Sequence, residues 1–206
     1  SSKGDGSVED YYKGFKLMKD IGDFIVINIS CPNTGDGCSF EESPLLLERL
    51  LKKINNKDKI IFLKLSIDID GEQVDKIIFL AGKYNISGFI IGNLCKEREG
   101  LRSTKKELSK VRGVLSGKPV KDKSDELIKY IYKKTKGRFV IIGVGGIFSA
   151  EDAYVKIKNG ASLVQLITGM IYEGPGLIKE INQGLVELME KDGCRDIREV
   201  VGVDVK

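Results

Sequence analysis

Five short apolar runs alternate with longer amphipathic segments along this chain, and no other feature limits the possible folds as strongly. The runs lie at residues 24–30, 60–66, 88–93, 139–146 and 162–169. A short apolar run bounded by turn residues is typical of a strand buried in a parallel sheet. The segments between the runs keep helical spacing, so the pattern predicts an α/β fold with right-handed helical crossovers.

Polar residues and glycines gather where these runs end. In barrels and in open α/β sheets alike, ligands bind at the carboxyl ends of the strands. Five strands cannot close an eight-stranded barrel. The sheet is therefore either open, or the first part of a barrel is missing from this sequence.

The first run continues into an unusual polar stretch, Asn28-Ile29-Ser30-Cys31-Pro32-Asn33-Thr34. The carboxamides of Asn28 and Asn33 suit a flat ligand with amide edges. Cys31 between them is a candidate proton acceptor or nucleophile. The alternative is a buried structural cysteine beside two turn asparagines. In the second run, Lys64 is costly to bury unless it meets an anion or another acceptor.

Glycine-rich turns end the last two runs. Gly145-Gly146 follows the fourth run, and Thr168-Gly169 closes the fifth. Either turn alone could be purely conformational, because glycine is common wherever the backbone bends sharply. The pair at consecutive strand ends predicts a phosphate-bearing cofactor or substrate, since glycine lets backbone N–H groups approach phosphate oxygens. The turns do not form the GxGxxG dinucleotide motif.

Composition excludes several classes of function. Charged residues make up 31% of the chain and the net charge is +4, but the lysines are spread out and form no nucleic-acid-binding stripe. No apolar run is long enough to span a membrane, and no signal peptide is visible. The four cysteines form no CxxC pair, which indicates a reduced, intracellular setting. The chain has no histidine, which excludes Ser-His and Cys-His catalysis and most zinc chemistry.

Five ordered motifs resemble dihydroorotate dehydrogenase. They are Asn28–Thr34, Leu115–Pro119, Ile141–Gly146, Gly160–Leu166 and Glu173–Pro175, within a match from about Val8 to about Val203. The Ser-Gly-Lys-Pro and Glu-Gly-Pro segments are similar to the quinone-linked, membrane-associated class of that family. The resemblance implies a (β/α)₈ barrel, of which this chain covers about the last five βα units. It also implies that residues 1–206 form one FMN-binding domain.

The resemblance also implies a reaction and its site. The family oxidises dihydroorotate to orotate in pyrimidine (UMP) biosynthesis, taking a proton from C5 and passing a hydride from C6 to FMN. Cys31 matches the position of the catalytic base. The positions that match FMN contacts are Asn28, Lys64, Gly92, Gly117, Gly146, Ile167 and Thr168. Those that match contacts to the orotate ring are Asn28, Asn33, Asn93 and Leu94; no metal site is implied. A quinone is the implied electron acceptor, and the implied location is the cytoplasm or the surface of the inner membrane.

Three positions depart from the family pattern. The base of the quinone-linked class is usually serine. This chain has Cys31 at that position, and a cysteine base is typical of the soluble classes. The family has Asn-Thr where this chain has Asn93-Leu94, and a threonine where it has Gly92. Leu94 cannot donate a hydrogen bond, and a lost bond of this kind typically costs about 0.5–1.5 kcal/mol.

The first three strands of the family barrel would precede Ser1. We therefore expect a fragment, a barrel half supplied by another chain, or self-association, because two sheet edges would otherwise be exposed. Two alternatives remain open besides dihydroorotate oxidation. One is a related flavin barrel acting on another dihydropyrimidine. The other is a truncated, non-catalytic remnant that binds a phosphate ligand or a partner chain.

Overall fold

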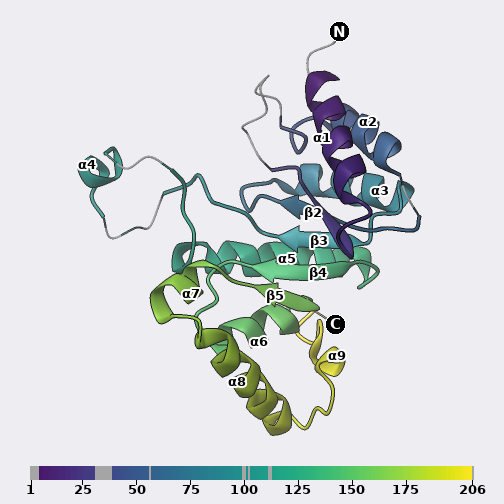
Figure 1. Ribbon diagram of the computed structural model, residues 1–206. Coiled ribbons are helices and arrows are strands. Elements are labelled where there is room, and N and C mark those ends of the chain that lie inside the picture. Colours follow the sequence, from purple (N-terminus) through teal and green to yellow (C-terminus); the bar gives the residue numbers. More distant parts are fainter. Residues whose placement is uncertain are drawn as a thin grey trace. The chain divides into compact units, whose positions relative to one another are not determined.

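The computed structural model describes residues 5–30, 39–55, 57–98, 101, 103–110 and 113–205. Within them, five parallel strands numbered in chain order alternate with helices, which confirms the α/β class expected from the sequence (Figure 1). The chain divides into two compact units. The first unit comprises residues 1–65 and 69–90, and the second comprises residues 66–68 and 91–206. That residues 1–206 act as one domain stays a prediction.

In the first unit, strands β1 (Phe24–Asn28) and β2 (Ile60–Leu65) pair in parallel. Helices α1 (Asp5–Met18), α2 (Pro44–Ile54) and α3 (Gly71–Lys83) accompany them. Ser43 caps α2 by accepting a hydrogen bond from the Leu46 amide at 3.4 Å, as the Ser-Pro pair predicts. The apolar face of α2 buries Leu47, Leu50 and Leu51 completely, and α2 packs on α1 and α3.

The second unit begins at the end of β3 (Gly88–Ile91) and contains the last two strands, β4 (Val140–Val144) and β5 (Leu163–Gln165), which pair in parallel. Its helices are α4 (Lys105–Leu108), η1 (Lys118–Val120), α5 (Lys121–Thr135), α6 (Ala150–Lys158), α7 (Thr168–Glu173), α8 (Leu177–Lys191) and α9 (Ile197–Val200). Helix α6 packs on α8 beside β5, around a core of Ile147, Ala153, Leu177 and Ile181 (Figure 1).

Two boundaries differ from the sequence pattern. Ser124 is a good cap residue, and the pattern places the start of a helix there, but α5 already begins at Lys121 and Ser124 lies buried inside it. The fifth strand ends at Gln165, and Thr168-Gly169 opens helix α7. A Cβ atom on Gly169 would lie only 2.2 Å from the Ile147 carbonyl oxygen, so this helix start has room for glycine alone.

Buried Tyr154 ties helix α6 to the segment after α8. Its hydroxyl donates to Asp192 Oδ2 at 2.8 Å. Burial, and then the hydrogen bond to the Asp192 carboxylate, raise the pKa of Tyr154 to about 12, against an ordinary value of 10.0. The folded state therefore keeps the phenol proton over a pH range in which the unfolded chain loses it.

We expect this tyrosine to make the chain less stable in alkali. Its contribution is complete below pH 10 and is lost as the pH rises toward 12. Tyr154→Phe should be less stable than the parent near neutral pH but should lose less further stability between pH 10 and 12. Urea unfolding across this range measures the free energy of unfolding of each protein. The lysine titrations are common to both proteins and cancel in the difference between the two free energies. Parallel curves for the two proteins would contradict the prediction.

Candidate functional site

The turn at Gly117 meets the start of helix α7 in the second unit. Gly117 has φ 76°, and a Cβ atom there would lie only 2.8 Å from Thr168 Cγ2 and 3.6 Å from the Phe148 ring. Thr168 Oγ1 also donates a hydrogen bond to Ser116 Oγ at 3.0 Å. The positive φ and the close approach both require glycine at this position.

The turn after β4 lies against the start of helix α5. Gly145 has φ 115° and Gly146 has φ 72°. A Cβ atom on Gly146 would overlap the Cβ atom of Lys121 and lie 2.8 Å from its Cα atom. On Gly145 it would lie 3.0 Å from Val120 Cγ2. Backbone N–H groups at such turns form concave sites that bind anions.

These contacts bring three of the residues predicted to bind the cofactor, Gly117, Gly146 and Thr168, to one end of the second unit. We call Gly117, Gly145, Gly146 and Thr168 the glycine cradle. Phe148 links its two parts, because it follows the Gly146 turn and its ring lies 3.6 Å from the place a Cβ atom on Gly117 would take. Ile167 is the residue before α7 and is 63% exposed. A cradle of glycine backbone and one hydroxyl fits a phosphate group, as the sequence pattern predicts.

The segment after β3 also reaches this end of the unit. The Gly92 amide donates to the Val144 carbonyl at 3.2 Å. A Cβ atom on Gly92 would lie 2.7 Å from Ile67 Cγ2. Buried Ile67 therefore occupies the space into which a threonine side chain would point. Asn93 is partly buried and Leu94 is 45% exposed.

Cys95, the next residue, is not a good base. Its thiol is buried and donates to Asp68 Oδ1 at 3.0 Å. Burial and then this hydrogen bond raise the pKa of the Cys95 thiol. The thiolate, which is the basic form, is thus disfavoured.

The first unit brings together two other predicted residues. Asn28 and Lys64 are partners in the register of β1 and β2, at the carboxyl end of each strand. Ser30 Oγ donates to Asn28 Oδ1 at 2.8 Å, and Tyr11 Oη donates to the Asn28 carbonyl at 2.8 Å. The Ser30 bond orients the Asn28 carboxamide, and the Tyr11 bond holds the Asn28 backbone. The predicted base Cys31 and the predicted ring contact Asn33 lie outside the described residues.

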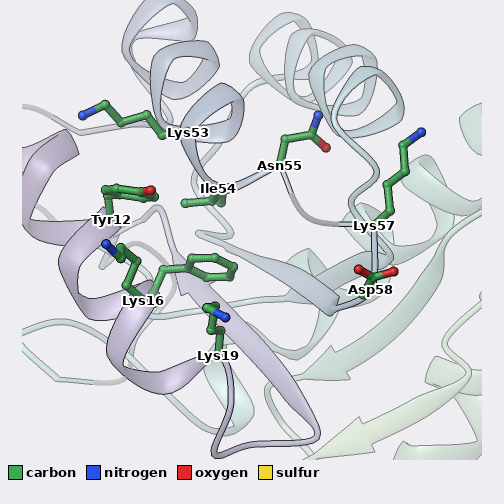
Figure 2. A pocket seen from close by; sticks show the side chains of 9 residues that line it. Tyr12, Lys16, Lys19, Lys53, Ile54, Asn55, Lys57 and Asp58 are labelled. Atoms are coloured by element: carbon green, nitrogen blue, oxygen red, sulfur yellow. The ribbon is translucent and has the colours of Figure 1, made fainter.

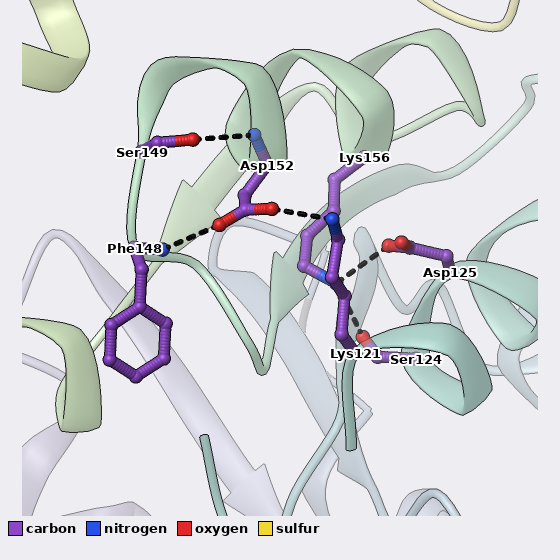
Figure 3. Close-up of polar contacts among 7 residues, drawn as sticks. All are labelled: Lys121, Ser124, Asp125, Phe148, Ser149, Asp152 and Lys156. Atoms are coloured by element: carbon purple, nitrogen blue, oxygen red, sulfur yellow. Dashed lines mark hydrogen bonds and ion pairs between the residues drawn. The ribbon is translucent and has the colours of Figure 1, made fainter. Parts of the chain in front are cut away.

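Two ion pairs behind the glycine cradle were not anticipated from the sequence (Figure 3). Lys121 contacts Asp152 at 2.5 Å, and Lys156 contacts Asp125 at 2.7 Å. The bond to Asp152 raises the pKa of Lys121. Burial raises the pKa of Asp125 and lowers that of Lys156. One available signal was the spacing of Lys156 three residues after buried Ala153, which puts a lysine on the apolar face of its helix.

A groove of about 610 Å³ lies in the first unit, lined by lysines around the Tyr12 ring (Figure 2). The amino groups of Lys16 and Lys53 lie 5.7 and 5.3 Å from the centre of that ring, and Lys53 also pairs with Glu9. Lys57 and Asp58 place the groove at the amino end of β2. In parallel α/β folds the chemistry is at the opposite, carboxyl ends, so we do not assign the groove to the site.

The fold and the glycine cradle define a parallel α/β protein with a candidate phosphate site at its strand ends, and comparisons identify the family. A family model described as Dihydroorotate dehydrogenase matches residues 1–189. Dihydroorotate dehydrogenase (quinone) of Nostoc punctiforme is 42% identical over 207 residues, which cover 97% of this chain and 55% of the relative. The corresponding protein of Trichodesmium erythraeum is 41% identical over 206 residues, covering 97% and 54%.

Solved structures agree with the sequence relatives. A crystal structure of ligand-free DHODH from Eimeria tenella matches with a TM-score of 0.86 and 28% identity, over 96% of this chain and 60% of that one. The chain therefore belongs to the dihydroorotate dehydrogenase family, a family of FMN-dependent oxidoreductases, and the predicted five βα units of its barrel are confirmed. The chain spans about half the length of the curated relatives it matches.

Proposed function

We propose that this chain takes part in the FMN-dependent oxidation of dihydroorotate to orotate in pyrimidine (UMP) biosynthesis. The observation that carries the proposal is the glycine cradle of the second unit, in which Gly117 lies against Thr168 and Gly146 lies against Lys121. A Cβ atom at either glycine would collide with protein atoms, Thr168 at Gly117 and Lys121 at Gly146, so this close packing of the turns requires glycine. Family membership supports the same function, since it is shown independently of this geometry.

The residues present fit FMN. Gly117, Gly146, Ile167 and Thr168 would hold its phosphate, and Gly92 would contact its ring system. In the first unit, Asn28 would donate a hydrogen bond to the flavin, and Lys64 would stabilise negative charge on it. When bound, FMN supplies the hydride acceptor, and the protein supplies orientation and electrostatics.

The substrate contacts come from the polar stretch after β1 and the residues after β3. Asn28, Asn33 and Asn93 would pair with the amide edges of the pyrimidine ring, and Leu94 would pack on it. Cys31, as thiolate, would take the proton from C5 while the hydride leaves C6, which forms the C5–C6 double bond of orotate. A thiol is more acidic than a serine hydroxyl, so cysteine can serve as base at this position.

A quinone is the electron acceptor we propose, as in the names of the relatives. Such an acceptor would bring the protein to the surface of the inner membrane. No helix among the described residues is long and apolar enough to cross a membrane.

Lys64→Ala should weaken FMN binding by about tenfold, which is the usual loss for one hydrogen bond to a charged group. Flavin fluorescence titration measures the affinity. Lys76→Ala is the matched control, because Lys76 is an exposed lysine of α3 that pairs with Glu72 at 3.8 Å and has no part in the proposed site. Equal affinities of the Lys64 variant and the parent would remove Lys64 from the flavin site.

A flavin barrel acting on another dihydropyrimidine is a second candidate function. It is favoured by the Ile67 side chain, which fills the space beside Gly92, and by apolar Leu94, because both remove hydroxyl donors from the segment after β3. Anaerobic flavin reduction by dihydroorotate and by dihydrouracil, which lacks the carboxylate, separates the two. Faster reduction by dihydrouracil would support the second candidate.

A further inference from the structure

Lys156 is the most deeply buried charged residue among those described, with a relative exposure of 0%. It extends from helix α6 beneath β4, where its Cδ atom would lie 3.2 Å from a Cβ atom on Gly143. Its ammonium donates to Asp125 Oδ1 at 2.7 Å and to Ser124 Oγ at 3.1 Å, both on α5 (Figure 3). The ammonium therefore has partners on the helix before β4, although it comes from the helix after it.

Ser124 links this ammonium to the glycine cradle. Its hydroxyl accepts from Lys156 and donates to the Val144 carbonyl oxygen at 2.6 Å. Gly145 and Gly146 follow Val144 directly, so the carbonyl that Ser124 holds belongs to the peptide whose N–H is that of Gly145. A hydroxyl has only one proton to donate. Because the Ser124 oxygen accepts from Lys156, its own proton is directed at the Val144 carbonyl.

A second contact holds the other end of the same turn. Asp152 Oδ2 accepts from the Phe148 amide at 2.9 Å, while its other oxygen contacts Lys121. Ser124 and Asp152, each paired with a lysine, thus hold the turn on both sides of Gly145-Gly146, and Figure 3 shows the contact of Asp152 with the Phe148 amide. A loop held at both ends presents its N–H groups in one orientation, which is the condition for a preorganised anion site.

Stability alone is a poor explanation for Lys156. Desolvation acts against both charges of the pair, raising the pKa of Asp125 and lowering that of Lys156. Replacing a buried ion pair by apolar residues is often neutral or stabilising, so such a pair is weak support for the fold. Orientation of a neighbouring group is a role that an apolar residue of the same volume cannot fill.

We propose that Lys156, acting through Ser124, is a positioning residue that orients the Gly145-Gly146 backbone toward the phosphate of FMN. The inference rests on the proposed function, because it takes FMN as the ligand of the cradle. Lys156 itself does not touch the ligand. Its effect should therefore concern the phosphate and leave the contacts to the flavin ring unchanged.

The test compares FMN with riboflavin, which has the same ring system and no phosphate. Dissociation constants of both are measured by quenching of flavin fluorescence on the parent chain, Lys156→Met and Ser124→Ala. We expect each variant to bind FMN about tenfold more weakly, the loss for one well-oriented hydrogen bond to a charged group, and to bind riboflavin as the parent does. A purely structural role would weaken both ligands equally.

Two features keep the result interpretable. Ser124→Ala retains the Lys156–Asp125 pair, so it tests the link even if Lys156→Met does not fold. Tyr154→Phe is the control on the same helix, since Tyr154 is buried and contacts Asp192. This control should lower stability without changing the ratio of the FMN and riboflavin affinities.

The outcomes separate the two proposals. If the parent prefers FMN to riboflavin and both variants keep the full preference, the positioning role is wrong and the proposed function stands. The positioning role is also wrong if both ligands weaken together. If the folded parent binds neither flavin, the proposed function fails, and the inference fails with it.

Discussion

Replacing Gly146 by alanine should abolish FMN binding and destabilise the chain. Gly146 has φ 72°, and its new methyl group would overlap the Lys121 side chain and approach the Lys121 Cα atom. Backbone atoms cannot rotate away as the end of a flexible side chain can. A non-glycine residue forced into such a backbone conformation lowers stability by about 1–3 kcal/mol. A shift of the turn that relieved the overlap would also displace its N–H groups from the phosphate. FMN titration and urea unfolding measure the two effects.

Gly14→Ala is the matched control for this change. Gly14 lies within helix α1, and nothing approaches within 4 Å of the place a Cβ atom would take. Alanine there should leave FMN binding unchanged and raise stability by roughly 0.5–1 kcal/mol, because glycine is unfavourable inside helices. Parent-like FMN affinity in the Gly146 variant would show that the turn does not bind the phosphate.

Cys31→Ala should leave FMN bound and stop its reduction by dihydroorotate. The methyl group cannot take the C5 proton, and loss of a positioned base typically lowers rates by about 10²–10⁴-fold. Anaerobic stopped-flow absorbance of the flavin band measures the rate. The prediction rests on the family motif, since Cys31 lies outside the described residues.

Cys194→Ala is the control for thiol loss. Cys194 lies after helix α8, where its thiol contacts the Asp192 carbonyl at 3.9 Å, and it has no part in the proposed site. This variant should reduce its flavin at the parent rate. If the Cys31 variant also did so, the base would have to be another group.

The order of strands and helices could be predicted from the sequence because apolar runs and helical spacing are local patterns. Ser43 illustrates this, since its cap of α2 depends on residues within one turn. Ser124 shows the limit. The same residue type looks like a cap, but the structure uses it to bind a carbonyl twenty residues away in β4. Only the packing of α5 on β4 decides between these uses.

The site was predictable in part for the same reason. Glycines at strand ends predicted the cradle, because the positive φ values of Gly117 and Gly146 favour glycine whatever the tertiary fold. The Lys156–Asp125 and Lys121–Asp152 pairs were missed because each joins helices α5 and α6, which are brought near by folding alone. The conflict between Ile67 and a side chain at Gly92 is likewise a tertiary contact.

The absorption spectrum of the purified chain, before and after anaerobic addition of dihydroorotate, tests the central claim most directly. A flavin band that bleaches on addition is the predicted result, because it requires bound FMN, a substrate site and a working base together. A well-folded sample that has no flavin band and takes up no added FMN would contradict the account, and would favour a non-catalytic remnant of the family.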